Sequence, residues 1–521
     1  MMGLCNGNNG YYHKCSWVMV AVFILTMAFP CFGLARAELT DAAIENAVER
    51  QLMADQAIPA YRITPECANG VVSLKGTVSN ILAKDRTLEI TETVKGVRSV
   101  INLITVSAFQ DKSDTRLQKN AIEALRMNPA TNVFDITVAV ADKKAALTGT
   151  VTSYREKQLA ETVIKGVSGI ESVENDILIS YPARQSDSQI LAEIEQGLLW
   201  DALVDHQLVE VKVKNGMVTL TGTIGSAAEK TRAISDSWVA GVKAVDASDL
   251  TVARWARDTD LRASKYVPKS DEKIKKAVML ALAKDPRISD DANVAVMVQA
   301  GTVTLKGSVD YLQARRAAAQ DAGNTVGVLR VRNHLKVAPL PVTINDTELA
   351  QNIKDALDRD AYVDVYDIQV NVRSGVADLY GNVNTYFEKM RAENLASTIA
   401  GIYFVNNNIA VARNWSPYLY SPYMNQERFP GEAYEWYNFT APSSQKTDRE
   451  ILENIKEEIW WSPFVEEENV QVRVENGQAT LTGTVHSKLE HDAAIDNARE
   501  GGAESVNNQL AISPLLPPKK N

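Results

Sequence analysis

The stretch VSLKGTV at residues 72–78 recurs six times along this chain of 521 residues, with small changes between copies. Two close copies are VTLTGTI at residues 218–224 and ATLTGTV at residues 479–485. The central glycines are 73, 73, 85, 74 and 102 residues apart; they are Gly76, Gly149, Gly222, Gly307, Gly381 and Gly483. A repeat of this length predicts six copies of a small module instead of one large enzyme domain. A glycine inside a strand indicates a bulge or a close backbone approach, so we expect these glycines to be structural.

Each module is predicted to begin with an amphipathic helix. Apolar residues recur at i, i+4 and i+8, as in Ile274, Val278 and Leu282, which places them on one helical face. The pattern then changes to alternation, as in residues 209–213, which predicts a strand with one buried face. A turn, the glycine-containing strand, a second helix and a closing strand follow.

This order predicts an α+β fold, a tandem array of six small α-β-β-α-β domains. Each is expected to be a three-stranded mixed sheet with two helices on one face. The first two strands should form an antiparallel hairpin, and the third should pair in parallel after the second helix. The second module has Asp142-Lys143-Lys144 and no glycine at its hairpin turn, so we expect a different turn there. The predicted domains are residues 38–108, 113–182, 187–253, 270–338, 345–413 and 447–513, with a linker at 254–269 and an aromatic insert at 414–446.

Residues 1–37 are typical of a secretory signal peptide. They contain no Asp or Glu, and an apolar run from Trp17 to Phe29 follows Lys14. Small residues on both sides of Arg36 supply an A-x-A-type cleavage site before Glu38. An uncleaved membrane anchor is the alternative. We therefore expect an exported protein located in the periplasm.

The composition argues against several classes of function. The net charge is -10, whereas nucleic-acid binding needs clustered Lys and Arg. The same charge makes general attraction to anionic lipid weak, so lipid binding would have to be local. Three of the four cysteines lie in residues 1–37, which leaves Cys67 without an internal disulfide partner. We read Cys67 as a buried small residue in the first strand.

The sequence nominates no catalytic residue, no metal site and no cofactor. The histidines after residue 37 do not form His-Glu-x-x-His; they are His206, His334, His486 and His491. There is no Gly-x-Ser-x-Gly motif, no Walker loop and no dinucleotide fingerprint. An enzyme is therefore not expected.

The repeated strands, together with the closing segments GVRSVIN at 96–102 and GIESVEN at 169–175, resemble the BON family of bacterial osmotic-stress and nodulation domains. The resemblance covers nearly all of residues 38–513. It implies a non-enzymatic periplasmic or envelope protein of the osmotically inducible kind, whose domains bind phospholipid or bridge envelope components. Most members of the family carry one to three copies, so six copies are a departure.

The segments between modules are the candidates for partner or membrane contact. The insert at 414–446 is rich in aromatic residues, which suit a membrane interface or a protein interface. Its packing against the fifth or sixth module is the alternative. The candidate contact residues are Trp415, Tyr418, Tyr420, Tyr423, Trp436 and Tyr437, with Trp460 and Trp461 extending the same surface.

The linker at 254–269 also contains basic and aromatic residues, among them Arg254, Trp255, Arg262, Lys265 and Tyr266. The linker has two open interpretations, a solvated spacer and a local contact for anionic lipid.

For the whole chain, two functions are open: a protein that binds phospholipid through several weak sites, and a scaffold or chaperone-like protein that binds proteins without lipid. The lipid headgroup, the protein partner and the oligomeric state stay open.

Overall fold

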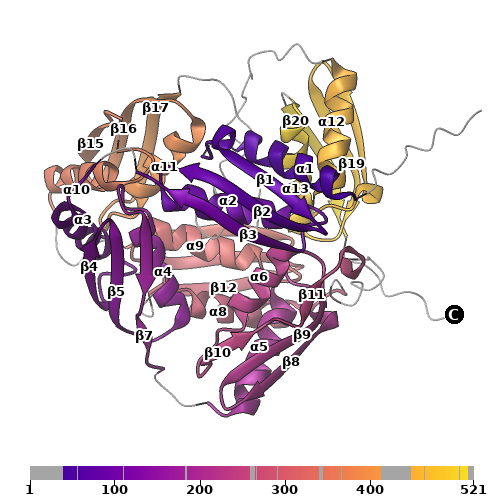
Figure 1. Ribbon diagram of the computed structural model, residues 1–521, viewed down its shortest axis with the longest axis horizontal. Coiled ribbons are helices and arrows are strands. Elements are labelled where there is room, and N and C mark those ends of the chain that lie inside the picture. The colour runs from indigo at the N-terminus through magenta and orange to yellow at the C-terminus, as the bar shows by residue number, and fades with distance from the viewer. Residues whose placement is uncertain are drawn as a thin grey trace, which may run out of the picture. The chain divides into compact units, whose positions relative to one another are not determined.

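The computed structural model describes residues 39–55, 57–108, 111–181, 185–257, 265, 267–289, 292–338, 344–364, 366–411, 447–462, 464–503 and 505–513. The predicted signal peptide, the aromatic insert and much of the 254–269 linker lie outside the described residues. Within them, the predicted α+β fold is confirmed: six modules follow one another, each with the order α-β-β-α-β (Figure 1).

The first helix of every module has 14 residues and buries the apolar positions that the sequence pattern predicts. In α8, the buried residues are Ile274, Ala277, Val278 and Leu282. The six first helices are α1 (Asp41–Ala54), α3 (Asp114–Met127), α5 (Asp187–Trp200), α8 (Asp271–Lys284), α10 (Asp346–Arg359) and α12 (Asp448–Trp461). Thr447 and Glu450 form the capping box that their spacing predicts at the start of α12.

A hairpin follows each first helix, and its second strand carries the repeated motif. The first strands are β1 (Ile63–Ala68), β4 (Asp135–Ala141), β8 (Val209–Lys214), β12 (Asn293–Gln299), β15 (Gln369–Arg373) and β18 (Val470–Glu475). The second strands are β2 (Val71–Val78), β5 (Lys144–Val151), β9 (Met217–Ile224), β13 (Thr302–Val309), β16 (Val376–Val383) and β19 (Gln478–Val485). Each second strand is the centre of its sheet.

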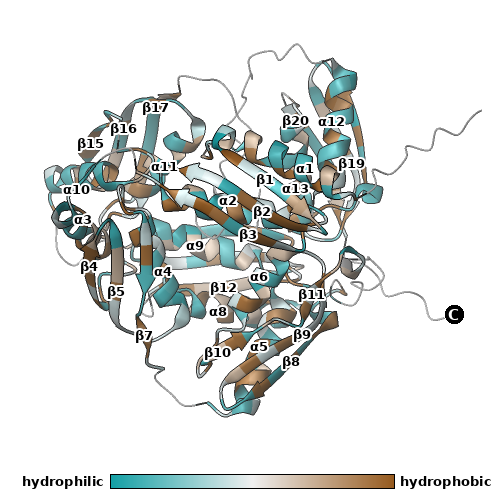
Figure 2. Ribbon diagram, viewed as in Figure 1, coloured by the Kyte–Doolittle hydropathy of each residue, from teal (hydrophilic) through white to brown (hydrophobic). Residues whose placement is uncertain are grey.

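A second helix and a parallel third strand complete each module. The second helices are α2 (Ile81–Thr93), α4 (Tyr154–Lys165), α6 (Ala227–Asp236), α9 (Leu312–Gly323), α11 (Tyr386–Ser397) and α13 (Lys488–Glu500). The third strands are β3 (Ser99–Val106), β6 (Ser172–Asn175) with β7 (Leu178–Ile179), β10 (Ala244–Asp246) with β11 (Leu250–Val252), β14 (Arg330–Val337), β17 (Phe404–Val411) and β20 (Ser505–Ile512). Apolar residues concentrate in the strands, while the helices are largely hydrophilic (Figure 2).

The motif glycines have positive φ angles, and the backbone at or just before the start of the first strand lies against them. At Gly307, φ is +118°, and an added Cβ would overlap the carbonyl oxygen of Asn293 on the neighbouring strand. The same close approach occurs at Gly76, Gly149, Gly222, Gly381 and Gly483. A side chain cannot be accommodated there, which is why the motif keeps glycine.

The first aspartate of each first helix accepts hydrogen bonds from the hairpin turn of the same module. In the fourth module, the Asp271 carboxylate accepts from the N–H groups of Ala300 and Gly301 at 2.8 and 3.0 Å. The same pair of bonds is made by Asp41, Asp114, Asp187, Asp346 and Asp448. The prediction of a different turn in the second module is wrong, because Asp142 and Lys143 adopt positive φ angles of 49° and 60°, as the other turns do.

The described residues from Leu39 to Ser513 belong to one compact unit, in which modules far apart in sequence are in contact. Antiparallel bridges join Asp201 of the third module to Thr325 of the fourth, and Val167 of the second to Asp360 of the fifth. The first module contacts the sixth, where Arg50 pairs with Glu457 at 2.6 Å. A module of about 70 residues has a limited core, and contact between modules adds to it.

Candidate functional site

The aromatic residues predicted for partner contact divide into two groups. Six of them lie outside the described residues: Trp415, Tyr418, Tyr420, Tyr423, Trp436 and Tyr437. The other two, Trp460 and Trp461, are only 9% and 6% exposed and belong to the core cluster of the first module. Lys95 of the first module lies 4.5 Å from the ring centre of Trp460. These two tryptophans join the sixth module to the first, so they are not part of an exposed contact surface.

The basic residues of the 254–269 linker do not gather into one patch among the described residues. Lys265 is buried, and its Nζ donates to the carbonyl oxygen of Val204 in the third module. Arg254 lies 5.7 Å from the ring centre of Trp460, whereas Trp255 is 59% exposed. Arg262 and Tyr266 lie outside the described residues. The described part of the linker therefore packs against its neighbours in places and is not simply a solvated spacer.

The first helix of the fourth module presents basic and apolar side chains together to solvent. On the side of α8 opposite its buried stripe, Lys273 and Lys276 are exposed beside Met279 and Leu280. Met279 is 49% exposed and Leu280 is 43% exposed, although both are large apolar residues. We call this surface, formed by these four residues, the α8 face. Cationic and large apolar side chains on one exposed helical face are typical of helices that bind anionic membrane surfaces.

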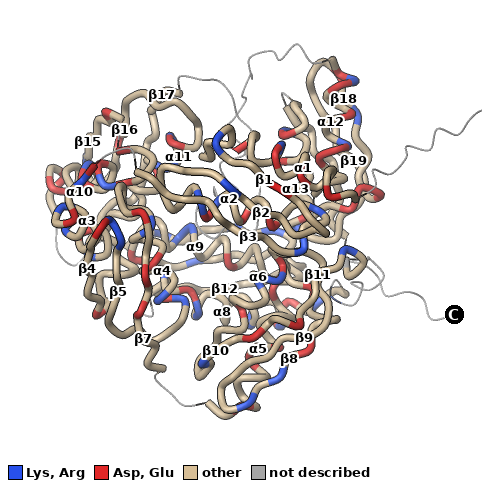
Figure 3. Tube along the Cα trace, in the orientation of Figure 1, with Lys and Arg blue, Asp and Glu red and all other residues tan. Residues whose placement is uncertain are grey.

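The charge of α8 distinguishes it from the other first helices. It contains four lysines and two acidic residues, a net charge of +2, whereas the other five first helices carry net charges from -3 to +1. Asp271 accepts hydrogen bonds from the hairpin turn. Glu272 faces Lys276 at 3.9 Å in an exposed pair. Such an exposed pair contributes little, so Lys276 is available to a ligand. Elsewhere, basic and acidic residues are interspersed along the chain (Figure 3).

The sheet of the fifth module exposes three aromatic side chains. Tyr380 on β16 and Phe404 on β17 are 44% and 55% exposed, and Tyr403 is 37% exposed. Val376 and Phe404 are paired across the two strands, and the ring of Tyr403 lies over Gly375. Tyr380 lies further along the sheet, because it pairs with Asn408. Exposed aromatic residues are enriched in protein interfaces. We call Tyr403 and Phe404, which adjoin one another at the start of β17, the β16–β17 patch.

The described residues contain no group of three or more His, Cys, Asp or Glu side chains placed to hold a metal ion. Cys67 is partly buried, and its Sγ donates to Oδ1 of Asp41 at 3.3 Å. Burial, together with the Asp41 carboxylate, raises the pKa of the Cys67 thiol to about 11. The thiol is therefore protonated at neutral pH and unsuited to nucleophilic chemistry.

None of the described helices combines the length and the apolar character needed to cross a bilayer. The α8 face was not predicted from the sequence, because the exposed Met279 and Leu280 stand next to the residues of the buried apolar stripe. The unusually high number of lysines in this first helix was the sequence signal that could have identified the face.

Comparisons with known proteins agree with the repeat structure. The BON domain family matches six stretches: residues 40–108, 113–181, 186–254, 270–339, 345–413 and 447–514. Osmotically-inducible protein Y of Escherichia coli (strain K12) is 35% identical over 118 residues, which are 21% of this chain and 59% of that protein. The match thus spans little more than half of that relative.

Two solved structures of CdsD, a structural protein of the type III secretion system of Chlamydia trachomatis, were also found. Each is 19% identical to this chain, with TM-scores of 0.11 and 0.12. They cover 39% and 40% of this chain and 90% and 96% of the solved chains.

Proposed function

Because this chain belongs to the BON-domain family, we propose that it is a non-enzymatic protein of the bacterial envelope that binds anionic phospholipid. The observation that carries this proposal is the α8 face, where Lys273 and Lys276 lie beside the exposed Met279 and Leu280. The lysines would contact lipid phosphates, and the two apolar side chains would enter the boundary between headgroups and acyl chains.

Binding through this face must be local, because the net charge of the chain is -10. A basic residue near an anionic membrane contributes about 1 kcal/mol, so two lysines give weak attraction. Burial of Met279 and Leu280 adds to it in proportion to the apolar area removed from water. Exposed apolar residues in another module, such as Ile101 and Leu103 on β3, would supply further weak contacts. Several linked weak sites can raise the overall affinity.

The location and the physiological role complete the proposal. The predicted signal peptide at residues 1–37 supports export to the periplasm. The printed name of the Escherichia coli relative, osmotically-inducible protein Y, supports a role in osmotic or envelope stress.

Vesicle binding tests the proposal. Residues 38–521 should co-sediment with phosphatidylglycerol vesicles, less so at high salt, and not with phosphatidylcholine vesicles. The variant Lys273→Glu/Lys276→Glu should lose most of this binding. The matched control is Arg116→Glu/Lys119→Glu, which makes the same charge change at two exposed positions of α3. Absence of sedimentation with every lipid, or equal losses in the two variants, would contradict the proposal.

A protein-binding scaffold is the second candidate, and the β16–β17 patch favours it. Tyr403 and Phe404 offer a protein partner two exposed aromatic side chains at the start of β17 in the fifth module. Under this alternative, the variant Tyr403→Ser/Phe404→Ser should reduce capture of envelope proteins in the absence of lipid. Deletion of residues 416–442 should also weaken partner binding and leave the modules folded, if the aromatic insert contributes to docking.

A further inference from the structure

The sheet of the fourth module carries a row of cationic side chains on its outer face, the face turned away from α8 and α9. The exposed residues of β14 occupy every second position of the strand: Arg330, Arg332, His334 and Lys336. Side chains on one face of a strand repeat about every 6.6 Å along it. Lys306 of β13 is also exposed and pairs with His334 in the register of the two strands. We call these five residues the β14 face.

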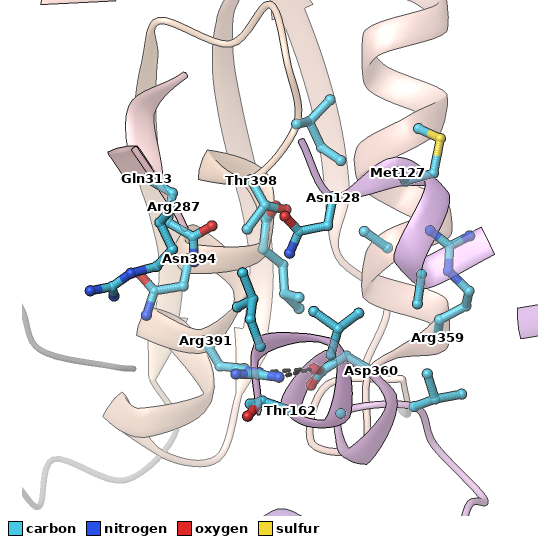
Figure 4. Close-up of a pocket in the computed structure, with 18 residues that line it drawn as sticks. Met127, Asn128, Thr162, Arg287, Gln313, Arg359, Asp360, Arg391, Asn394 and Thr398 are labelled. Carbon is cyan, nitrogen blue, oxygen red and sulfur yellow. Dashed lines mark hydrogen bonds and ion pairs between the residues drawn. The ribbon is translucent and has the colours of Figure 1, made fainter. Parts of the chain in front are cut away.

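The cations of the β14 face have no carboxylate partners in the part of the chain that the structure describes, unlike arginines elsewhere. Arg391 lines a small pocket between modules, where it donates to Oδ2 of Asp360 at 2.6 and 2.8 Å (Figure 4). Arg316 of the fourth module pairs with Glu393 at 2.7 Å. In contrast, the three strands β12, β13 and β14 contain no Asp or Glu. The charged donors of the β14 face are therefore available to a ligand.

β14 differs in charge from the third strands of the other modules. No Lys, Arg or His occurs in the other third strands that the structure describes: β3, β6, β7, β10, β11, β17 and β20. In β3, for example, the exposed side chains at the central positions are Ile101 and Leu103. Five modules thus form the same fold without cations here. The fold does not require the charges of β14, so we looked to binding for their role.

The other side chains of this face argue against nucleic acid and against membrane insertion. The strands β12, β13 and β14 contain no aromatic residue, whereas proteins hold single-stranded nucleic acid by stacking its bases on aromatic side chains. Met297, which is 46% exposed, is the only large apolar side chain that these three strands expose. One such side chain gives little apolar area to enter a bilayer.

An extended acidic peptide is complementary to the β14 face in charge and in spacing. A peptide in extended conformation with an acidic residue at every second position repeats its carboxylates at the same interval of about 6.6 Å. The guanidinium groups of Arg330 and Arg332 are suited to bidentate donation to carboxylates. Met297 lies in one cross-strand row with Arg332, through Thr304, and offers contact to an apolar side chain of the peptide.

The peptide is expected to lie across the face instead of adding a strand to the sheet. β14 is at the edge of its sheet, because the strand order is β12-β13-β14. Within this edge strand, the N–H of Leu335 donates to Oδ1 of Asn333 at 3.1 Å. That donor is therefore not available to a strand that would pair with β14.

We propose that the β14 face binds an extended acidic segment of a protein partner, with Arg330, Arg332, Lys336 and Lys306 as the charged donors. The net charge of -10 repels an acidic partner, but repulsion from distant charges is screened beyond about 10 Å at 0.1 M salt, so the face acts locally. This inference goes beyond the proposed lipid binding and is independent of it, because the α8 face belongs to the helical side of the module.

Fluorescence anisotropy tests the proposal with a fluorescein-labelled peptide of alternating Glu and Ser residues, titrated with residues 38–521. Wild type should bind the peptide saturably, and more weakly at high salt, because salt screens exposed charges. The variant Arg330→Glu/Arg332→Glu should bind it about tenfold more weakly or worse, since attractive contacts become repulsive. Both side chains are exposed, so the exchange leaves the core of the module intact.

Two control variants and a control peptide make the test specific. Arg116→Glu/Lys119→Glu makes the same charge change on α3 and should retain peptide binding. Lys273→Glu/Lys276→Glu should also retain it, which separates the β14 face from the α8 face. A peptide of the same length and composition, with its Glu residues in adjacent pairs, should bind more weakly because its carboxylates do not follow the two-residue repeat.

Three results would count against this binding. No saturable binding by wild type, or equal binding by wild type and Arg330→Glu/Arg332→Glu, would overturn the proposal. Equal affinity for the two peptides would overturn the match to the strand repeat. Tighter binding of phosphatidylglycerol vesicles or of a single-stranded oligonucleotide, lost in the same variant, would overturn the assignment of an acidic peptide as the ligand.

Discussion

Lys112 of the second module and Asp364 of the fifth form an ion pair, with Nζ 3.0 Å from Oδ2, although 252 residues separate them in the sequence. The two side chains are only 5% and 6% exposed. The hydroxyl of Ser168 donates to the same carboxylate oxygen at 2.6 Å. A buried pair of this kind fixes one geometry between two modules, because neither charge has water as an alternative partner.

Asp364→Ala should therefore destabilise the protein strongly. It leaves the Lys112 ammonium and the Ser168 hydroxyl without their acceptor, and removing one partner of a buried pair costs about 3–5 kcal/mol. Denaturant unfolding measures the change. Glu453→Ala is the control, because it breaks an exposed pair with Arg449 and should cost about 0.5 kcal/mol or less. Similar effects of the two substitutions would show that the buried pair does not hold the modules together.

Glu92 should make stability depend on pH. It lies between the first and third modules, and its burial raises the pKa of the carboxyl to about 7, against a smaller lowering effect of its hydrogen bond from Thr231. A carboxyl whose pKa is raised by folding stabilises the folded state while it is protonated. That stability decreases as the pH rises from about 4.5 through about 7.

Glu92→Gln should accordingly raise the free energy of unfolding at pH 8 by about 1–2 kcal/mol and change it little at pH 4. The gain expected at pH 8 is smaller than the full pKa shift implies, because the residue is only partly buried and solvent screens its charge. The glutamine oxygen can still accept from Thr231. Urea unfolding at the two pH values measures the difference. A substitution that destabilises equally at both pH values would show that the carboxyl has an ordinary pKa in the folded protein.

Two glycines of the fourth module should respond oppositely to alanine. Gly307→Ala places a Cβ against the carbonyl oxygen of Asn293 at a φ of +118°, so we expect a loss of about 3 kcal/mol or more. Gly323 is the last residue of α9, and an added Cβ would meet no heavy atom within 4 Å. Gly323→Ala should raise stability by up to about 1 kcal/mol. Thermal unfolding compares them, and equal tolerance of both would contradict the structural role of the motif glycine.

The sequence predicts the interior of each module well, because local periodicity encodes it. The i, i+4, i+8 stripe of α8 and the glycine of β13 both report contacts made within about 70 residues. Contacts between modules have no such signal. Lys112 has the sequence character of a surface residue, and its burial depends on Asp364 in another module.

The aromatic candidates show the same limit. A tryptophan pair at the end of a helix fits an exposed contact surface and a buried interface equally well. The structure buries Trp460 and Trp461 because the first module, more than 350 residues away, lies against them. The turn at Asp142-Lys143 was mispredicted for a related reason. The Asp114 carboxylate accepts both N–H groups of the turn and stabilises positive φ angles without a glycine.

The α8 face is the surface that we propose to contact the membrane, and an environment-sensitive label tests this contact most directly. In residues 38–521 with Cys67→Ser, an NBD fluorophore is attached to Leu280→Cys or, as the control, to Met53→Cys on α1, which is similarly exposed at 53%. Phosphatidylglycerol vesicles should raise and blue-shift the emission at position 280 and leave position 53 unchanged. No change at position 280, or equal changes at both positions, would contradict binding through this face.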